Sequence, residues 1–259
     1  MKSLIIAVAL LLSCVSVQAQ TKYFNSFDDT KIAFTDEGDG KPILLIHGFI
    51  NTRKSWENTA LKKDLIAKGF RVIIPDLRGN GDSDKPHDDE AYAHDAEVMD
   101  LMFLMAELKI SKYWAVGYSR GSILLAKLLT KDKRLKKAVL GGMGIDFTNR
   151  NWKRRIMFRD AFNGKITAET EGAVAYAKSI NADLKSLYLQ QKHQSVTTKK
   201  QLQYIKAKVL VIAGDKDNDN GSPQALQAAI GKSKLKIVSG NHNETYKTAE
   251  FSKAICAFL

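Results

Sequence analysis

Short apolar segments alternate with amphipathic ones along most of this chain, and this alternation restricts the fold more than any other feature. The apolar segments predict strands over residues 42–46, 71–74, 113–116, 138–140, 208–212 and 235–238. The amphipathic segments predict helices over residues 56–68, 98–108, 122–130, 222–230 and 245–258. Strands separated by helices are typical of βαβ units, and fully apolar strands are typical of a sheet buried on both faces. With an antiparallel hairpin over 23–35 at one edge, we predict an α/β fold with a mostly parallel, doubly wound sheet.

The alternation is interrupted once, between about residues 147 and 200, where no strand pattern occurs. Helical segments in this interval carry the aromatic side chains Trp152, Phe158, Phe162, Tyr176 and Tyr188. Since the strand pattern resumes afterwards, the interval is predicted to be a helical lid inserted into one domain. A chain of 259 residues is long enough for one such domain, which we predict over residues 20–259.

The first 19 residues have the composition of a secretory signal peptide. Lys2 gives a positive start, residues 4–12 are continuously apolar, and small residues precede Gln20 at the positions that a signal peptidase needs. The apolar run is too short for a transmembrane helix, which needs about 20 residues. We therefore predict cleavage before Gln20 and export to the periplasm or the exterior. A lipoprotein cleavage site at Cys14 is the alternative, and it would tether the protein to a membrane.

The chain is basic, with 40 Lys and Arg against 28 Asp and Glu and a formal charge of +12. Such a charge raises nucleic acid, anionic membranes and acidic substrates as partners. Residues 147–200 hold 11 of the basic residues and four acidic ones, so much of the excess lies in the predicted lid. Nucleic acid is excluded, because export is predicted and no recognition motif accompanies the basic residues. A solvated lid surface remains open, and so does peripheral contact with anionic membrane, with Trp152 and Phe158 inserted beside the basic cluster.

The segment Gly117–Gly121 has the sequence Gly-Tyr-Ser-Arg-Gly and lies directly between a predicted strand and a predicted helix. In this context the motif is typical of a strained turn that projects a serine hydroxyl from the edge of a sheet. The glycines allow close packing of the backbone, and the N-terminus of the following helix supplies free N–H groups. Ser119 is therefore the predicted nucleophile.

Two further polar residues follow strands later in the chain. Asp217 comes after the next-to-last predicted strand, and His242 comes after the last one. Binding sites of open α/β sheets lie at the carboxyl ends of the strands, and the chain order Ser, Asp, His is the one expected here. We predict His242 as the base and Asp217 as the acid. Asp215 and Asp219 are nearby, and Asp146 or Asp215 could replace Asp217 in this role.

His47-Gly48-Phe49 lies at the end of the first predicted buried strand. A glycine there lets the backbone approach a bound carbonyl group, and the amide of Phe49 can pair with the amide of Arg120. Two such donors form an oxyanion hole, in which the loss of one donor typically costs about 10²–10³ in rate. His47 itself is predicted to be structural.

Together these segments resemble the α/β-hydrolase fold superfamily, in its capped, esterase-like branch of serine hydrolases. The matching segments are His47–Phe49, Asp76–Ser83, Gly117–Gly121, Gly214–Asp217 and Gly240–His242, and the likeness covers about residues 23–259. The resemblance implies a helical lid over the sheet and a loop over Asp76–Ser83 that shapes the floor of the site. It implies that the nucleophile, acid, base and oxyanion amides are Ser119, Asp217, His242, Phe49 and Arg120. It implies neither a metal nor an organic cofactor.

The resemblance predicts a serine hydrolase that cleaves a small-molecule carboxylic ester through an acyl-enzyme. A serine at position 119 argues against the haloalkane dehalogenases and epoxide hydrolases, which resemble this fold but use aspartate there. Carbon–carbon bond hydrolases, perhydrolases and acyltransferases share the triad and remain alternatives, as does a non-catalytic binding protein with this fold. Arg120 stands where an apolar residue is commoner, which predicts a narrower pocket or an anionic substrate.

Overall fold

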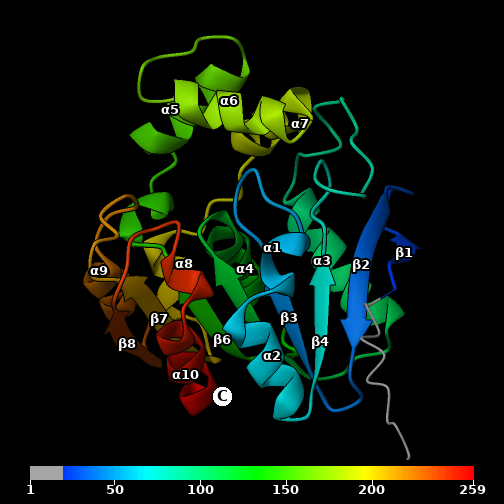
Figure 1. Cartoon of the computed structure of the whole chain (residues 1–259), viewed down its shortest axis with the longest axis vertical. Coiled ribbons are helices and arrows are strands. Elements are labelled where there is room, and N and C mark those ends of the chain that lie inside the picture. Colours follow the sequence, from blue (N-terminus) through cyan, green and yellow to red (C-terminus); the bar gives the residue numbers. More distant parts are fainter. Residues whose placement is uncertain (1–19) are drawn as a thin grey trace, which may run out of the picture.

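Eight strands form one sheet in the computed structural model, which describes residues 20–259 (Figure 1). In chain order they are β1 (Lys22–Asn25), β2 (Lys31–Glu37), β3 (Lys41–Ile46), β4 (Phe70–Pro75), β5 (Tyr113–Tyr118), β6 (Leu135–Gly141), β7 (Lys208–Gly214) and β8 (Ser233–Val238). Their spatial order is β1-β2-β4-β3-β5-β6-β7-β8. β2 pairs antiparallel with β1 and with β4, whereas every other neighbouring pair is parallel. The predicted mostly parallel sheet with a hairpin at one edge is confirmed.

Helices cover both faces of the sheet, and the side chains of β3 alternate between the two apolar cores that result. Ile43 and Leu45 belong to one core, and Leu44 and Ile46 belong to the other. The first core is covered by α1 (Lys54–Glu57), α2 (Ala60–Ala67) and α10 (Ala249–Phe258). The second is covered by α3 (Ala96–Glu107), α4 (Arg120–Lys131), α8 (Lys199–Gln203) and α9 (Pro223–Ala228). Burial on both faces explains the fully apolar sequence of β3, and the doubly wound prediction is confirmed.

Two of the predicted helices are divided in the structure. The helix predicted over 56–68 is α1 followed by α2, because the Thr59 hydroxyl accepts a hydrogen bond from an α2 amide at 3.3 Å and donates to an α1 carbonyl at 2.7 Å. The helix predicted over 245–258 is a 3₁₀ turn (Thr245–Lys247) followed by α10, with Thr248 as the capping residue. A threonine hydroxyl satisfies unpaired amides at the start of a helix, and hydrophobic periodicity does not detect this.

Between β6 and β7 the chain forms helices and, among the described residues, no strand. The segment consists of a 3₁₀ turn (Ile145–Thr148), α5 (Lys153–Phe162), α6 (Glu171–Ser179), α7 (Leu184–Lys192) and α8. Figure 1 shows α5, α6 and α7 as a layer beyond one end of the sheet, whereas α8 packs back against α4. The predicted helical insertion is confirmed, and we call the three helices α5, α6 and α7 the lid.

The lid has a small apolar core that it shares with the loop after β3. Phe162, Val174 and Leu187 come from the three lid helices, and Ile50 comes from the loop. The ring of Phe49 packs edge-on against Phe162, with the ring centroids 5.3 Å apart. The lid is therefore packed against the segment that follows the carboxyl end of β3.

The predicted signal peptide and the predicted lipoprotein site lie outside the described residues. Within residues 20–259, no helix is both long enough and apolar enough to cross a membrane. Export, and anchoring through Cys14, therefore stay predictions from the sequence.

Candidate active site

Ser119 lies on the sharp turn between β5 and α4, with φ of 53° and ψ of −123°, a conformation rare for residues other than glycine. The turn is so tight that a Cβ on Gly117 would lie 2.4 Å from the carbonyl oxygen of Gly121. A Cβ on Gly121 would lie 2.3 Å from the carbonyl oxygen of Ile46 in the neighbouring strand β3. The two glycines therefore permit the backbone turn that presents the serine.

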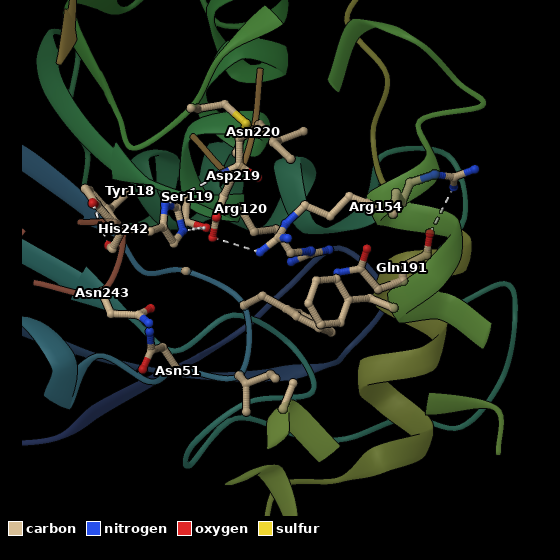
Figure 2. A pocket seen from close by; sticks show the side chains of 18 of the residues that line it. Asn51, Tyr118, Ser119, Arg120, Arg154, Gln191, Asp219, Asn220, His242 and Asn243 are labelled. Carbon is tan, nitrogen blue, oxygen red and sulfur yellow. Dashed lines mark hydrogen bonds and ion pairs between the residues drawn. The ribbon is translucent and has the colours of Figure 1, made fainter. Parts of the chain in front are cut away.

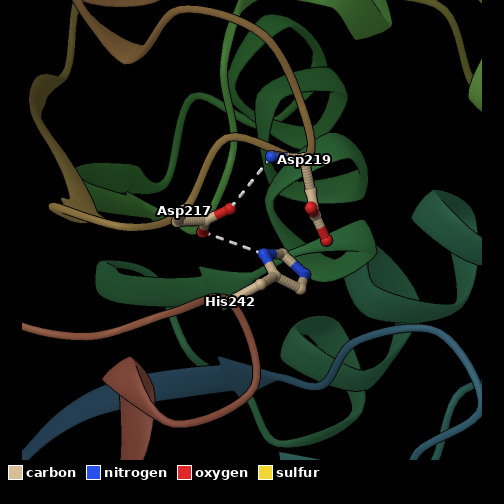
Figure 3. Close-up of side chains that lie close together, drawn as sticks. All are labelled: Asp217, Asp219 and His242. Atoms are coloured by element: carbon tan, nitrogen blue, oxygen red, sulfur yellow. Dashed lines mark hydrogen bonds and ion pairs between the residues drawn. The ribbon is translucent and has the colours of Figure 1, made fainter.

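Ser119, His242 and Asp217 form one hydrogen-bonded chain. Ser119 Oγ lies 2.9 Å from His242 Nε2 (Figure 2), and His242 Nδ1 lies 2.8 Å from an oxygen of Asp217 (Figure 3). Because an ionised carboxylate can only accept, Nδ1 donates to Asp217 and Nε2 is free to accept from the serine hydroxyl. The Asp217 side chain is 1% exposed, and the Tyr118 hydroxyl donates to the His242 carbonyl oxygen at 2.7 Å. The structure thus brings three predicted residues together from the ends of β5, β7 and β8.

The other aspartates near these strand ends have different surroundings. Asp146 is exposed, and its carboxyl group lies against the loop before α9. Asp215 accepts a hydrogen bond from a backbone amide after β8 at 2.9 Å. Asp219 lies beside the imidazole but pairs with Arg154 at 3.1 Å. Among the described residues, Asp217 is the carboxylate that hydrogen-bonds His242.

Asp217, Asp219 and His242 also offer three ligand atoms that lie within 4.8 Å of one another (Figure 3). Carboxylates and imidazole suit several divalent metals. However, His242 Nδ1 and Asp217 are already bonded to each other, and Asp219 faces the guanidinium of Arg154. A cation here would have to break the first contact and repel Arg154, so the contacts favour a hydrogen-bonding role for this group.

The backbone amides of Phe49 and Arg120, predicted as oxyanion donors, lie on the two segments that flank Ser119. Gly48 approaches so closely that a Cβ on it would lie 3.3 Å from Ser119 Cβ. Arg120 is the first residue of α4, where a helix leaves its amides without partners. No described residue accepts a hydrogen bond from the amide of Phe49 or from that of Arg120. Both donors are therefore available to a ligand.

The Arg120 side chain points away from solvent and is 3% exposed. Its guanidinium forms a two-pronged ion pair with Glu97 of α3 and donates to the Gln190 carbonyl oxygen in the lid at 3.1 Å. Arg120 lines the pocket, but it supplies no free positive charge to a substrate because Glu97 compensates its charge. Glu97 was not among the residues predicted from the sequence, although its position four residues before Leu101 places it on the buried face of α3.

His47 lies buried beneath the site. Its Nδ1 donates to the Gly48 carbonyl oxygen at 2.8 Å, and its Nε2 accepts from the Leu77 amide at 3.1 Å. The contact at Nε2 requires the neutral ring, because a protonated nitrogen cannot accept. Burial lowers the pKa of His47 below its usual value and so favours the neutral form. Leu77 belongs to the loop over 76–83, which is tied to the core in this way. The contacts fit the structural roles predicted for His47 and for the loop.

A cavity of about 590 Å³ lies between the hydrogen-bonded chain and the lid. Ser119 and His242 line one side, and Trp152, Phe158 and Tyr176 line the lid side. Figure 2 shows polar groups from the core and from the lid on opposite sides of this cavity. Trp152 and Phe158 thus contribute to the cavity wall. Contact of the lid with an anionic membrane stays a prediction from the sequence.

The sequence of this chain matches a family model described as alpha/beta hydrolase fold over residues 41–169. A putative non-heme chloroperoxidase of a Synechocystis strain is 40% identical over 111 residues, which are 42% of this chain and 39% of that protein. The match thus spans about two fifths of the relative's length.

Solved structures resemble nearly the whole chain. A bromoperoxidase from Bacillus anthracis superposes with a TM-score of 0.74 at 23% identity, covering 92% of this chain and 99% of the other. An esterase from Exiguobacterium antarcticum gives a TM-score of 0.72 at 19% identity, with the same coverage. At such identities the likeness establishes the fold, while the chemistry must be argued from the side chains.

Proposed function

Because the chain belongs to the α/β-hydrolase fold superfamily, we propose that it is a serine hydrolase that cleaves a small-molecule carboxylic ester. The observation that carries the proposal is the hydrogen-bonded chain from Ser119 through His242 to the buried Asp217. A nucleophile, a base and a group that orients the base are the minimum that covalent acyl transfer requires. The nearby cavity gives a small ester access to Ser119.

In the proposed mechanism, His242 Nε2 takes the proton of Ser119 as the serine oxygen attacks the ester carbonyl. Asp217 keeps the imidazole in the right tautomer and stabilises its cation, and the amides of Phe49 and Arg120 donate to the oxyanion. His242 then protonates the leaving alcohol, and an acyl group remains on Ser119. Water activated by His242 attacks this acyl-enzyme, which releases the acid and restores the hydroxyl.

A second candidate function is that of a perhydrolase. It is suggested by the names of similar proteins, which include a putative chloroperoxidase and a bromoperoxidase. The same residues would form the acyl-enzyme, and hydrogen peroxide in place of water would release a peracid. Measuring peracid and free acid from one ester in the presence of peroxide separates the two candidates. We expect free acid to be the main product.

We expect a fluorophosphonate probe to label Ser119 and p-nitrophenyl butyrate to be hydrolysed. Ser119→Ala should abolish both, because the nucleophile is removed. Ser122→Ala is the matched control, since the Ser122 hydroxyl donates only to the carbonyl groups of Gly117 in the same turn and of Gly141 at the end of β6. This control should keep labelling and turnover. A wild-type protein that neither reacts with the probe nor hydrolyses esters would instead be a binding protein.

A further inference from the structure

Positive charge outweighs negative charge among the side chains that line the cavity. The charged residues that line it are Arg120, Arg154, Arg155, Lys247 and Asp219. Arg120 is compensated by Glu97. Of the described carboxylates, Asp219 alone faces the remaining three cations from the cavity wall. A neutral ester does not need such an arrangement, whereas a substrate with its own negative charge would be attracted by it.

Arg154 extends from α5 across the cavity towards the site. One N–H group of its guanidinium donates to Asp219 at 3.1 Å, and the guanidinium carbon lies 5.1 Å from the centre of the Phe158 ring (Figure 2). The side chains of Arg154 and Asp219 are 32% and 46% exposed, so their ion pair contributes little net stability. A guanidinium has five N–H donors and binds carboxylates best with two of them. Asp219 accepts from one N–H group of Arg154 only, so the guanidinium can still bind a second carboxylate through two N–H groups.

Arg155 adds a positive charge that no described carboxylate compensates. Its guanidinium donates to the carbonyl oxygens of Gln191 and Arg150 at 2.9 and 2.8 Å, and its buried Nε has no acceptor among the described residues. Burial and the neighbouring Arg159 and Arg150 lower the pKa of Arg155, as expected for an uncompensated cation. The field in the cavity is therefore positive beside Arg154.

We propose that the substrate carries a carboxylate and that Arg154 binds it, next to the ester bond that Ser119 attacks. This inference rests on the proposed serine-hydrolase function and adds the substrate class. Asp219 lies within 4.8 Å of the imidazole group of His242 and contacts Arg154 at 3.1 Å, so Arg154 lies close to the proposed catalytic base. Monoesters of short dicarboxylic acids and aryl esters with a carboxylate fit this description.

The experiment compares two pairs of esters of similar size. Monoethyl adipate and ethyl heptanoate differ by a carboxylate on the acyl side, and para-acetoxybenzoate and its methyl ester differ on the alcohol side. In at least one pair, we expect kcat/KM for the ester with the carboxylate to exceed that for the neutral ester by about tenfold or more. This factor is typical of a hydrogen bond to a charged group. Raising the salt concentration should reduce this preference.

Arg154→Gln should abolish the preference, whereas Asp219→Asn should increase it, because the competing carboxylate is removed. Arg159→Gln is the matched control: Arg159 lies on the same helix and pairs with Asp160, but it does not line the cavity. This control should keep the wild-type preference. An equal loss for charged and neutral esters in Arg154→Gln would make Arg154 a lid contact only and overturn the inference.

Calorimetric binding of adipate gives a readout that needs no turnover. In a Ser119→Ala background, adipate should bind, and the added Arg154→Gln change should weaken binding about tenfold or more. If neutral esters are hydrolysed but neither pair shows a carboxylate preference, the inference is wrong and the serine-hydrolase proposal stands. If no ester is hydrolysed and the probe does not react, the proposed function fails, and adipate binding alone decides whether the anion site exists.

Discussion

Four aspartates lie after the strands near His242, and their surroundings assign them different roles. Asp217 is buried and accepts from His242 Nδ1 at 2.8 Å. Asp146 is exposed, Asp215 holds a loop amide, and Asp219 pairs with a lid arginine. A buried carboxylate is costly unless it is hydrogen-bonded, and the imidazole supplies that bond. Burial and the distance to His242 Nδ1 therefore distinguish Asp217 from the other three aspartates.

Asp217→Asn is expected to lower kcat for an ester by roughly 10²–10⁴-fold, because an amide does not hold the imidazole in the productive tautomer. Asp146→Asn, the matched control, should change kcat by less than about twofold, since its carboxylate is exposed. Steady-state kinetics of the two variants on p-nitrophenyl butyrate provide the comparison. A large loss in Asp146→Asn with full activity in Asp217→Asn would reverse the assignment.

The turn between β5 and α4 depends on close packing of its backbone. Its two flanking glycines have no room for a side chain, as the 2.4 and 2.3 Å approaches at Gly117 and Gly121 demonstrate. Gly172 in the lid helix α6 differs, since a Cβ there would meet no atom within 4 Å. Glycine is therefore required by packing in the turn, whereas the packing of α6 would accommodate a side chain at Gly172.

Gly121→Ala should destabilise the protein by about 1–3 kcal/mol, because the new methyl group collides with a backbone oxygen of β3. Gly172→Ala should instead stabilise it by about 0.4–1 kcal/mol, because alanine restricts the unfolded chain and fits the helix. Thermal or urea unfolding of both variants measures these changes. Equal effects of the two substitutions would contradict the packing described for the turn.

Across the whole molecule, charged groups are buried beneath the site as well as spread over the surface. Arg53 pairs with Asp76, and Arg78 pairs with Asp100, all of them nearly inaccessible. The neutral His47 lies in the same region, and its ring nitrogens bond only to backbone groups. Such groups make the free energy of unfolding depend on pH, each group in its own pH range.

We expect the free energy of unfolding to fall in two stages as the pH is lowered. The pKa of His47 is lowered in the fold, so the unfolded chain takes up a proton first, and stability is lost below about pH 6.5. The pKa values of Asp36 and Asp132 are lowered by their arginine partners despite burial, so their contribution is lost below about pH 3.8.

Urea unfolding at several pH values measures both stages. His47→Gln should reduce the dependence on pH just below about pH 6.5 and leave the acid stage unchanged. A wild-type stability that stays constant over this interval would contradict the neutral, buried state of His47.

Features that depend on neighbouring residues could be predicted from the amino-acid sequence. The alternation of strands and helices predicted the doubly wound sheet, and the Gly-Tyr-Ser-Arg-Gly segment between a strand and a helix predicted the turn at Ser119. Because parallel strands end at one edge of a sheet, the positions of Asp217 and His242 could also be predicted. Divided helices escaped prediction, since capping by Thr59 and Thr248 does not alter the apolar periodicity.

The pairing of charged side chains depends on the packing of segments that are distant in the sequence. Arg120 was predicted beside the nucleophile, but its partner Glu97 lies 23 residues away on another helix. Arg154 meets Asp219 across 65 residues and across the cavity. No local pattern in the sequence indicates such pairs. The packing of α3 against α4 sets the distance in the first pair, and the packing of the lid over the sheet sets the distance in the second. The positions of the proposed reacting groups could thus be predicted from the sequence, whereas the fold determines the charge that surrounds them.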